Sequence, residues 1–294
     1  MDLLYYGVVR MNNIMTNSLN TVRPATVAKA GNPGATTRRS IADLLAPLDQ
    51  LAVNSPNIVA NRQARFEVEG ECYVLPHYLF IGPKSGDAPI RIGIFAAIHG
   101  DEPEGAYAAV RFLHFLETYA ELAAGYCLTI YPVCNPTGFE DNTRHSRRGK
   151  DLNREFWSKS AEPEVDLLEA ELVSHSFHGI VSLHVDDTSD GFYGIVNGAT
   201  LAKNLIEPAL KAADAFLPLD QRGLIDGFPA RNSVVRDLFP GVLRAPTVVR
   251  PRPFEITLEA PKGRPAFLTE YAFVAALQSI LANYRKFIAY AQNL

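Results

Sequence analysis

The chain has 294 residues, of which 47% are hydrophobic and 20% charged, enough for one large α/β domain or two smaller ones. Its net charge of −4 disfavours a nucleic-acid-binding protein, which usually carries an excess of basic residues. No apolar stretch approaches the roughly 18–20 residues that a membrane helix needs, and the three cysteines lack C-x-x-C spacing. We therefore expect a cytoplasmic protein that binds neither membranes nor nucleic acids.

The first forty residues differ from the rest of the chain. Between Leu3 and Ala42 there is no acidic residue, and there is no apolar segment of the kind that a secretory signal contains. We expect residues 1–39 to form a flexible leader, with a targeting segment as the alternative. The folded unit, residues 40–294, then begins at Ser40, which can cap a helix predicted to start at the next residue.

Beyond this helix, strand and helix patterns alternate along the chain. Strands are predicted over residues 64–80, 90–98, 127–134, 179–185 and 254–260. Helices are predicted over residues 103–124, 163–177, 199–217 and 265–290. Such alternation predicts a single α/β domain with a mostly parallel, mixed sheet and helices on both faces.

Polar residues gather where the predicted strands end, which is where ligands bind in such sheets. Four segments of this kind are His99–Glu102, Asn135–Gly138, His184–Asp187 and Glu259–Pro261. The other histidines fit structural roles; His77, for example, lies in a predicted strand and His175 near a helix end.

His99, Glu102 and His184 are candidate metal ligands. His99 and Glu102 are three residues apart where a strand meets a helix, so both side chains can point into one cleft. Two histidines and one carboxylate leave the fourth position of zinc open for water, as catalytic sites require. The H-x-x-E spacing alone is a weak signal, because a helix-capping glutamate beside an incidental histidine gives the same pattern.

Five short motifs, in this order, resemble the zinc carboxypeptidase superfamily. They are H-G-D-E-P-E-G at 99–105, N-P-x-G at 135–138, R-x4-G-x-D-L-N-R at 144–154, the strand-end histidine at 184 and T-x-E at 257–259. This superfamily includes carboxypeptidases, murein peptide amidases and the succinylglutamate desuccinylase/aspartoacylase group. The resemblance covers about residues 64–290 and implies a zinc-carboxypeptidase-like fold.

The resemblance implies that His99, Glu102 and His184 bind one Zn²⁺ per chain. It also implies that Glu259 deprotonates the zinc-bound water and passes the proton to the leaving nitrogen. Burying an acid inside an apolar strand without a purpose is costly, which favours a role for Glu259. Glu255 shares its face of the strand and is the competing base, although the T-x-E motif favours Glu259.

Three residues of the arginine-rich motif match substrate-contacting residues of the superfamily. The resemblance implies that Arg144 stabilises the oxyanion, while Asn153 and Arg154 hold the free carboxylate of the substrate. A planar guanidinium suits both tasks, because it donates paired hydrogen bonds to a carboxylate. Arg148 is a further candidate for substrate binding. For Arg148 and its neighbour Arg147, a solvated basic loop is the alternative.

The resemblance fails in one respect. Many carboxypeptidases carry a mobile tyrosine between the last zinc histidine and the catalytic glutamate, but no tyrosine occurs here from Ile195 to Glu259. Tyr193 is too close to His184 to be the same residue. The region instead contains six arginines, which favour either a substrate with more than one carboxylate or a solvated loop: Arg222, Arg231, Arg236, Arg244, Arg250 and Arg252.

We expect a zinc metallohydrolase that cleaves an amide or peptide bond next to a free carboxylate in a small peptide, as a carboxypeptidase or murein peptide amidase does. One alternative is an N-acyl amino acid deacylase of the succinylglutamate desuccinylase/aspartoacylase type, and another is a non-catalytic metal-binding scaffold. The nine-residue step from Arg144 to Asn153 favours the peptidase, whereas the compact size and the missing tyrosine favour the deacylase. The scaffold is disfavoured, because every ligand, arginine and base is present. The oligomeric state is left open.

Overall fold

The structure, a computed structural model, describes residues 38–196, 200 and 202–291. The predicted leader, residues 1–39, lies outside these residues except for Arg38 and Arg39. The backbone amide of Arg39 donates a hydrogen bond to the carbonyl of Glu140 at 2.9 Å, and its guanidinium donates to the carbonyl of Gly100 at 2.7 Å. The described fold therefore includes the residues immediately before Ser40.

A mixed sheet forms the centre of the fold and has ten strands in the described residues, in the order β1-β4-β6-β5-β7-β12-β8-β11-β10-β9. The strands are β1 (Ile58–Asn61), β4 (His77–Ile81), β5 (Ile90–Ala96), β6 (Tyr126–Tyr131), β7 (Gly179–Asp186), β8 (Tyr193–Val196), β9 (Leu224–Ile225), β10 (Phe228–Arg231), β11 (Val234–Val235) and β12 (Phe254–Pro261). Neighbouring strands β6, β5, β7 and β12 are parallel, and antiparallel β4 and β8 flank them. This arrangement confirms the predicted α/β class with a mixed, centrally parallel sheet.

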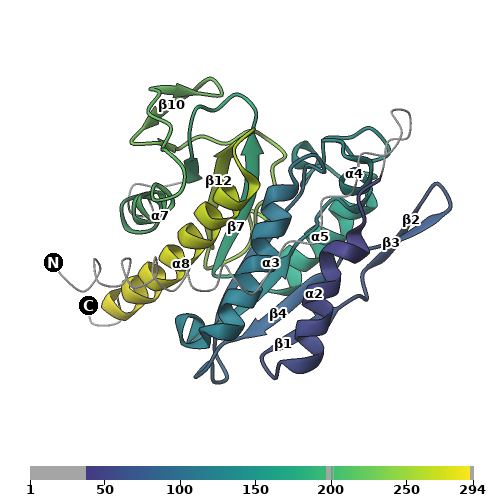
Figure 1. Cartoon of the computed structure of the whole chain (residues 1–294), viewed down its shortest axis with the longest axis horizontal. Coiled ribbons are helices and arrows are strands. Elements are labelled where there is room, and N and C mark those ends of the chain that lie inside the picture. Colours follow the sequence, from purple (N-terminus) through teal and green to yellow (C-terminus); the bar gives the residue numbers. More distant parts are fainter. Residues whose placement is uncertain (1–37, 197–199, 201, 292–294) are drawn as a thin grey trace. The chain divides into compact units, whose positions relative to one another are not determined.

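Helices cover both faces of the sheet. One face carries α2 (Ile41–Asn54), α3 (Pro103–Thr118), η3 (Ala202–Ile206), α7 (Glu207–Ala213) and α8 (Ala266–Ala291), of which α2, α3 and α8 are seen side by side in Figure 1. The opposite face carries α5 (Pro163–Ser174). Adjacent residues of β5 point to opposite faces, so Ile94 packs in the core beneath α3 while Phe95 packs in the core beneath α5.

The predicted strand over 64–80 is divided in the structure. Its first part forms a separate hairpin of β2 (Arg65–Val68) and β3 (Glu71–Val74), and only its last part joins the large sheet as β4. The two residues between β2 and β3, Glu69 and Gly70, have φ values of 52° and 79°. Positive φ at both positions suits a two-residue hairpin turn, which reverses the chain where the sequence pattern predicted continuity.

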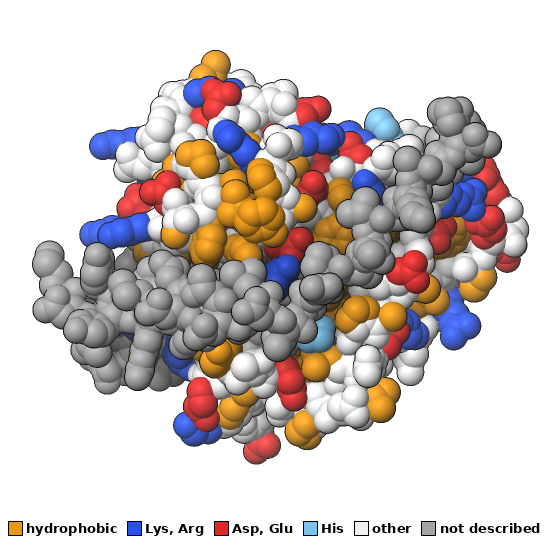
Figure 2. Space-filling model, in the orientation of Figure 1, with side chains coloured by type: hydrophobic (Ala, Val, Ile, Leu, Met, Phe, Trp, Pro, Cys, Tyr) orange, Lys and Arg blue, Asp and Glu red, His pale blue; other side chains and the backbone are white. Residues whose placement is uncertain are grey.

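The remaining elements are short and lie mostly near strand ends. They are η1 (Ala120–Ala123), α4 (Pro136–Asp141) and η2 (Leu152–Arg154). None of the helices in the described ranges combines the length and apolarity that crossing a membrane requires. On the face shown in Figure 2, basic and acidic side chains of the described residues are interspersed, without the basic stripe typical of a nucleic-acid-binding surface.

Candidate active site

The turn after β5 positions the first two predicted metal ligands. Ala97 has a left-handed backbone with φ of 48°, and the amide of Glu102 donates to the carbonyl of His99 at 3.2 Å. Pro103 then starts α3, where its missing amide proton is not needed. This turn points both side chains the same way and brings His99 Nδ1 within 2.6 Å of Glu102 Oε1.

His184 of β7 completes the group. Its Nδ1 lies 3.1 Å from Glu102 Oε2 and 3.3 Å from His99 Nδ1. The backbone amide of Val185 donates to Glu102 Oε2 at 2.9 Å, which fixes the carboxylate against the strand. All three predicted ligands are buried, and one ligand atom from each lies within 4.8 Å of the other two.

The donor set fits a zinc ion. Two imidazole nitrogens that face each other at 3.3 Å need a shared proton or a cation between them. Tetrahedral zinc with bonds of about 2.0–2.1 Å would place its nitrogen and oxygen ligands at similar separations. Burial alone would raise the pKa of Glu102, but its interactions with His99 and His184 outweigh burial and lower that pKa.

Asp151 is a member of the site that the sequence did not single out. Its Oδ1 lies 3.2 Å from His99 Nε2, and Arg144 donates two hydrogen bonds to its Oδ2, at 3.1 and 3.0 Å. A carboxylate on the outer nitrogen of a ligating histidine fixes the tautomer and orientation of the ring. Burial would raise the pKa of Asp151, but His99 and Arg144 together lower it. The sequence signal that could have identified Asp151 is its position between Arg144 and Asn153 in one motif.

The N-P-x-G motif packs against the turn that carries His99 and Glu102. Asn135 caps α4 by accepting from the amide of Gly138 at 2.8 Å, and its amide group donates to the carbonyl of Ile98 at 3.3 Å. The backbones of Gly100 and Gly138 approach so closely that a Cβ on Gly100 would lie 1.9 Å from the carbonyl carbon of Gly138. Glycine is therefore required next to His99 for steric reasons.

Glu259 faces the same cavity from β12. It is the register partner of His184 on the adjacent parallel strand, and it lines a cavity of about 150 Å³ together with His99, Glu102 and His184. Burial, followed by the negative charges of Glu102 and Asp186, raises the pKa of Glu259 well above its ordinary value. The competing base, Glu255, does not line this cavity, because its carboxylate accepts a hydrogen bond from the amide of Ala245 at 2.9 Å.

The predicted substrate-contacting residues divide into two groups. Arg144, Asn153 and Arg154 line the cavity, and the guanidinium of Arg154 lies 4.5 Å from the centre of the Phe239 ring. Arg148 does not line it; its guanidinium donates to the carbonyl of Ala161 at 3.0 Å instead. The structure thus brings Arg144, Asn153 and Arg154 to the candidate metal site and leaves Arg148 outside.

Arg147 also lies outside the cavity, but it is not part of a solvated loop. Its side chain is only 8% exposed and is paired with Asp141 at 2.8 Å and with Glu71 at 2.7 Å. Its guanidinium also lies over the Tyr73 ring, 5.2 Å from the centre. Arg147 therefore ties the hairpin of β2 and β3 to the loop that carries Arg144.

Acidic and apolar side chains also line the cavity. They include Asp186, Asp226, Leu238 and Phe239, and none of the six arginines between 222 and 252 is among the described lining residues. Tyr193 is buried, and its hydroxyl lies 3.1 Å from Asp186 Oδ2. Tyr193 therefore packs inside the fold as the first residue of β8 and does not line the cavity.

Comparisons with known proteins agree with this geometry. Residues 89–217 match the sequence profile of the succinylglutamate desuccinylase/aspartoacylase catalytic domain. A solved structure of a proposed metallopeptidase from Shewanella denitrificans is 24% identical to this chain and has a TM-score of 0.68. The match covers 82% of this chain and 89% of that one.

Two solved metallo-carboxypeptidases have the same fold at lower identity. The Burkholderia cenocepacia protein is 18% identical with a TM-score of 0.65, and the match covers 84% of this chain and 68% of that one. The Pseudomonas aeruginosa protein is also 18% identical, with a TM-score of 0.58 and coverage of 81% and 67%. No curated protein matches the sequence. The motif order and the profile match support the zinc carboxypeptidase superfamily, and the solved structures share the fold of this chain.

Proposed function

We propose that this protein is a zinc-dependent hydrolase that cleaves an amide or peptide bond next to a free carboxylate in a small substrate. The observation that carries the proposal is that Glu259, a carboxyl that is not one of the three clustered ligands, shares one cavity with them and with Arg144 and Arg154. Removing any one of these groups would leave the cavity without a base, a ligand or a cation for the substrate.

His99, Glu102 and His184 are the residues that would hold the metal. A zinc ion bound there would supply a Lewis acid that polarises the scissile carbonyl and activates water near neutral pH. Asp151 would keep His99 oriented, because it accepts from the ring nitrogen that faces away from Glu102. The backbone amide of Val185 would keep Glu102 in place during the reaction.

Glu259 would act as the general base and then as the general acid. Its carboxylate takes a proton from the attacking water and delivers it to the leaving nitrogen, which needs a pKa between those of the two partners. The place of Glu259 in the same cavity as the three clustered ligands puts it within reach of both transfers.

Arg144 and Arg154 would have different tasks. Arg144 lies 3.6 Å from Glu102 and is held by Asp151, so its charge is fixed beside the ligand cluster, where an oxyanion develops. Arg154 lies against Phe239 and donates to the carbonyl of Asn153 at 2.7 Å, which leaves other donors of the guanidinium for a substrate carboxylate. The Pseudomonas aeruginosa structure contains a succinic acid derivative, consistent with carboxylate recognition in this fold.

A deacylase acting on N-acyl amino acids is the second candidate. The profile match over residues 89–217 favours it, as does a cavity of about 150 Å³, which suits a compact substrate. The described cavity wall also lacks a tyrosine in place of the usual mobile one. The acidic side chains Asp186 and Asp226, which also line the cavity, would instead favour a substrate with a free amine, such as a dipeptide.

A substrate panel tests the proposal and separates the two candidates. Zinc-loaded protein would be assayed with dipeptides, γ-D-glutamyl-diaminopimelate peptides and N-acyl amino acids, each also in a form with the terminal carboxylate amidated. We expect hydrolysis of one class in its free-carboxylate form only. Equal turnover of the amidated forms would overturn carboxylate recognition, and the absence of turnover from a protein that binds zinc would favour the non-catalytic scaffold.

A further inference from the structure

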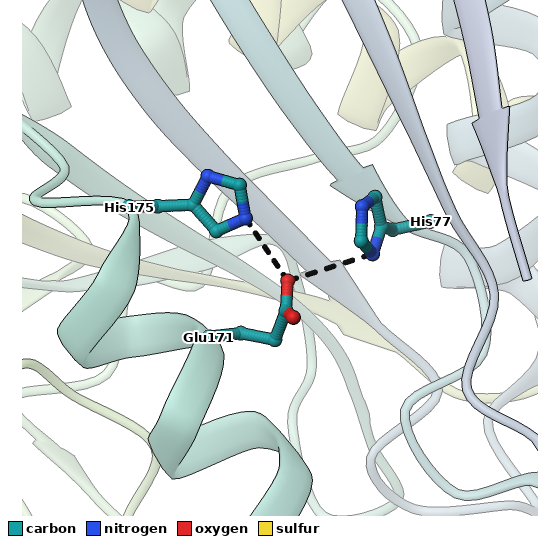
Figure 3. A group of neighbouring side chains, drawn as sticks. All are labelled: His77, Glu171 and His175. Atoms are coloured by element: carbon teal, nitrogen blue, oxygen red, sulfur yellow. Dashed lines mark hydrogen bonds and ion pairs between the residues drawn. The ribbon is translucent and has the colours of Figure 1, made fainter. Parts of the chain in front are cut away.

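A second group of metal-binding side chains lies outside the candidate active site. It consists of His77, Glu171 and His175, on the face of the sheet that α5 covers (Figure 3). His77 is the first residue of β4, Glu171 lies in the last turn of α5, and His175 is the C-cap residue of that helix. None of the three lines the cavity that holds Glu259.

The spacing on α5 places two of the three side chains together. Residues four apart lie on the same face of a helix, and His175 Nε2 is 3.0 Å from Glu171 Oε2. His77 reaches the same oxygen from the sheet, with its Nδ1 at 3.5 Å. Figure 3 shows the two imidazole rings approaching the carboxylate from different sides, and the ring planes are 88° apart.

The carboxylate is held in place from behind. The Tyr131 hydroxyl donates to Glu171 Oε2 at 2.5 Å, while the Tyr131 ring packs in the core beneath α5. The hydrogen bond from Tyr131 gives Glu171 a fixed orientation, as metal-ligating carboxylates usually have.

His77 provides the independent observation that points to a ligand. Its side chain is only 8% exposed, yet its Nδ1 has no hydrogen-bond partner among the residues that the structure describes. At 3.5 Å, Glu171 is too far for a normal hydrogen bond. A buried polar atom without a partner destabilises the fold, and a metal ion bound to that atom would remove this penalty.

We propose that His77, Glu171 and His175 bind a second divalent transition-metal ion, most suitably zinc, in a structural role. Two imidazoles and one carboxylate favour zinc over magnesium or calcium, which prefer oxygen ligands. Glu171 and His175 are half-buried, so an ion can enter and a water molecule can complete its coordination. Among the described residues, this group contains no carboxylate besides the ligand Glu171, so it lacks a general base like the one proposed for Glu259. The ion would instead cross-link β4 to the end of α5.

Metal stoichiometry tests this site without reference to activity. Metal-free protein would be loaded with Zn²⁺, separated from free metal by gel filtration and analysed for zinc by elemental analysis. We expect two zinc ions per chain in the wild type. We expect one in His77→Gln, one in His175→Gln and one in His99→Gln, because each variant loses a ligand of only one group. His114→Gln, a substitution of an exposed histidine on α3, is the matched control and should keep two.

The variants also distinguish this proposal from that of the active site. One zinc per chain, lost in His99→Gln but kept in His77→Gln and His175→Gln, would overturn the second site and leave the first intact. One zinc lost in His175→Gln but kept in His99→Gln would support the second site and contradict the first. If His77→Gln does not fold, the thermal unfolding temperature of His175→Gln is measured with and without zinc. Zinc should raise the unfolding temperature of His175→Gln by less than it raises that of the wild type. An equal rise in the two proteins would overturn the proposal.

Discussion

Glu259 and His184 occupy the same level of two adjacent parallel strands, β12 and β7, so their side chains project from the same face of the sheet into one cavity. The proposed base and a candidate metal ligand are thereby held at a fixed spacing by backbone hydrogen bonds. Glu255 lies four residues earlier on β12 and is the register partner of Ile180, at the opposite end of the strand pair.

This relationship predicts the effect of Glu259→Gln. The substitution keeps the shape of the side chain but removes the base, so zinc content and thermal stability should match the wild type while kcat falls by about 10²-fold or more. Glu255→Gln is the matched control and should retain most of the activity. Zinc loss from Glu259→Gln would make that residue a ligand, and an inactive Glu255→Gln would identify the other carboxylate as the base.

Arg144→Ala and Arg154→Ala should affect different kinetic constants. Arg154 is expected to hold a carboxylate that is present in both ground and transition states, so its loss should mainly raise KM. Arg144 is expected to stabilise charge that develops in the transition state, and its loss should lower kcat by about 10²-fold. Steady-state kinetics on the substrate found in the panel would measure both effects.

Arg148→Ala is the control for both arginines. Its guanidinium contacts Ala161 outside the cavity, so kcat/KM should stay within about two-fold of the wild type. A larger loss would restore Arg148 as a substrate-binding residue. Similarly small effects of Arg144→Ala and Arg154→Ala would contradict the roles proposed for those two residues.

Asp151 is predicted to be a positioning residue for His99. Asp151→Asn keeps an oxygen that can accept from the imidazole but removes the charge, so zinc affinity should fall by about 10–100-fold, as for other outer-shell carboxylates. Competition with a chelator would measure the affinity. Asp141→Asn, which changes an ion-paired carboxylate outside the cavity, should leave zinc affinity unaltered. An unaltered affinity in Asp151→Asn would show that His99 is oriented by other contacts.

The ion pairs of Glu71 predict a pH dependence of stability. Hydrogen bonds from Tyr73, Arg147 and Arg38 lower the pKa of Glu71 to about 2 from its ordinary value of 4.5. A lowered pKa in the folded state contributes stability above the unfolded pKa, and this contribution is lost as the pH falls through the folded pKa. In the metal-free protein, Glu71→Gln should therefore be less stable than the wild type at pH 7.

The same pair of proteins provides the test at acidic pH. The difference in unfolding free energy should shrink as the pH falls from about 4.5 to about 2, where the wild-type carboxyl also becomes protonated. Denaturant unfolding at several pH values would measure the difference. A difference that did not change with pH would mean that the charge of Glu71 does not contribute.

The central sheet and most of the site were predictable because their signals are local. The strands ending near His99 and His184 are continuous apolar runs, and polar residues directly after such runs face one edge of a parallel sheet. Strands β9, β10 and β11 were not predicted, because segments of two to four residues are too short to show periodicity.

The orientation of neighbouring loop residues could not be predicted. Arg147 and Arg148 are adjacent and chemically equal in the sequence, yet one is buried among acids and the other lies against a backbone carbonyl. Asp151 was missed because its role depends on the outer nitrogen of His99, which is distant in the chain. His77 and His175 were given structural roles, because nothing in a sequence indicates that a strand residue will meet a helix end.

The hydrogen bond from Arg39 to the carbonyl of Gly100 bears on where the domain can be cut. A shortened chain that starts at Ser40, the boundary that the helix cap suggests, would keep every residue of the five motifs. It would nevertheless lose the Arg39 guanidinium, which donates to the carbonyl of Gly100 in the turn that carries His99. It would also lose the backbone hydrogen bond from Arg39 to Glu140. Engineers who trim this protein for crystallisation or fusion should therefore place the first residue upstream of Arg38, since a cut chosen by motif boundaries would weaken the support of a candidate metal ligand.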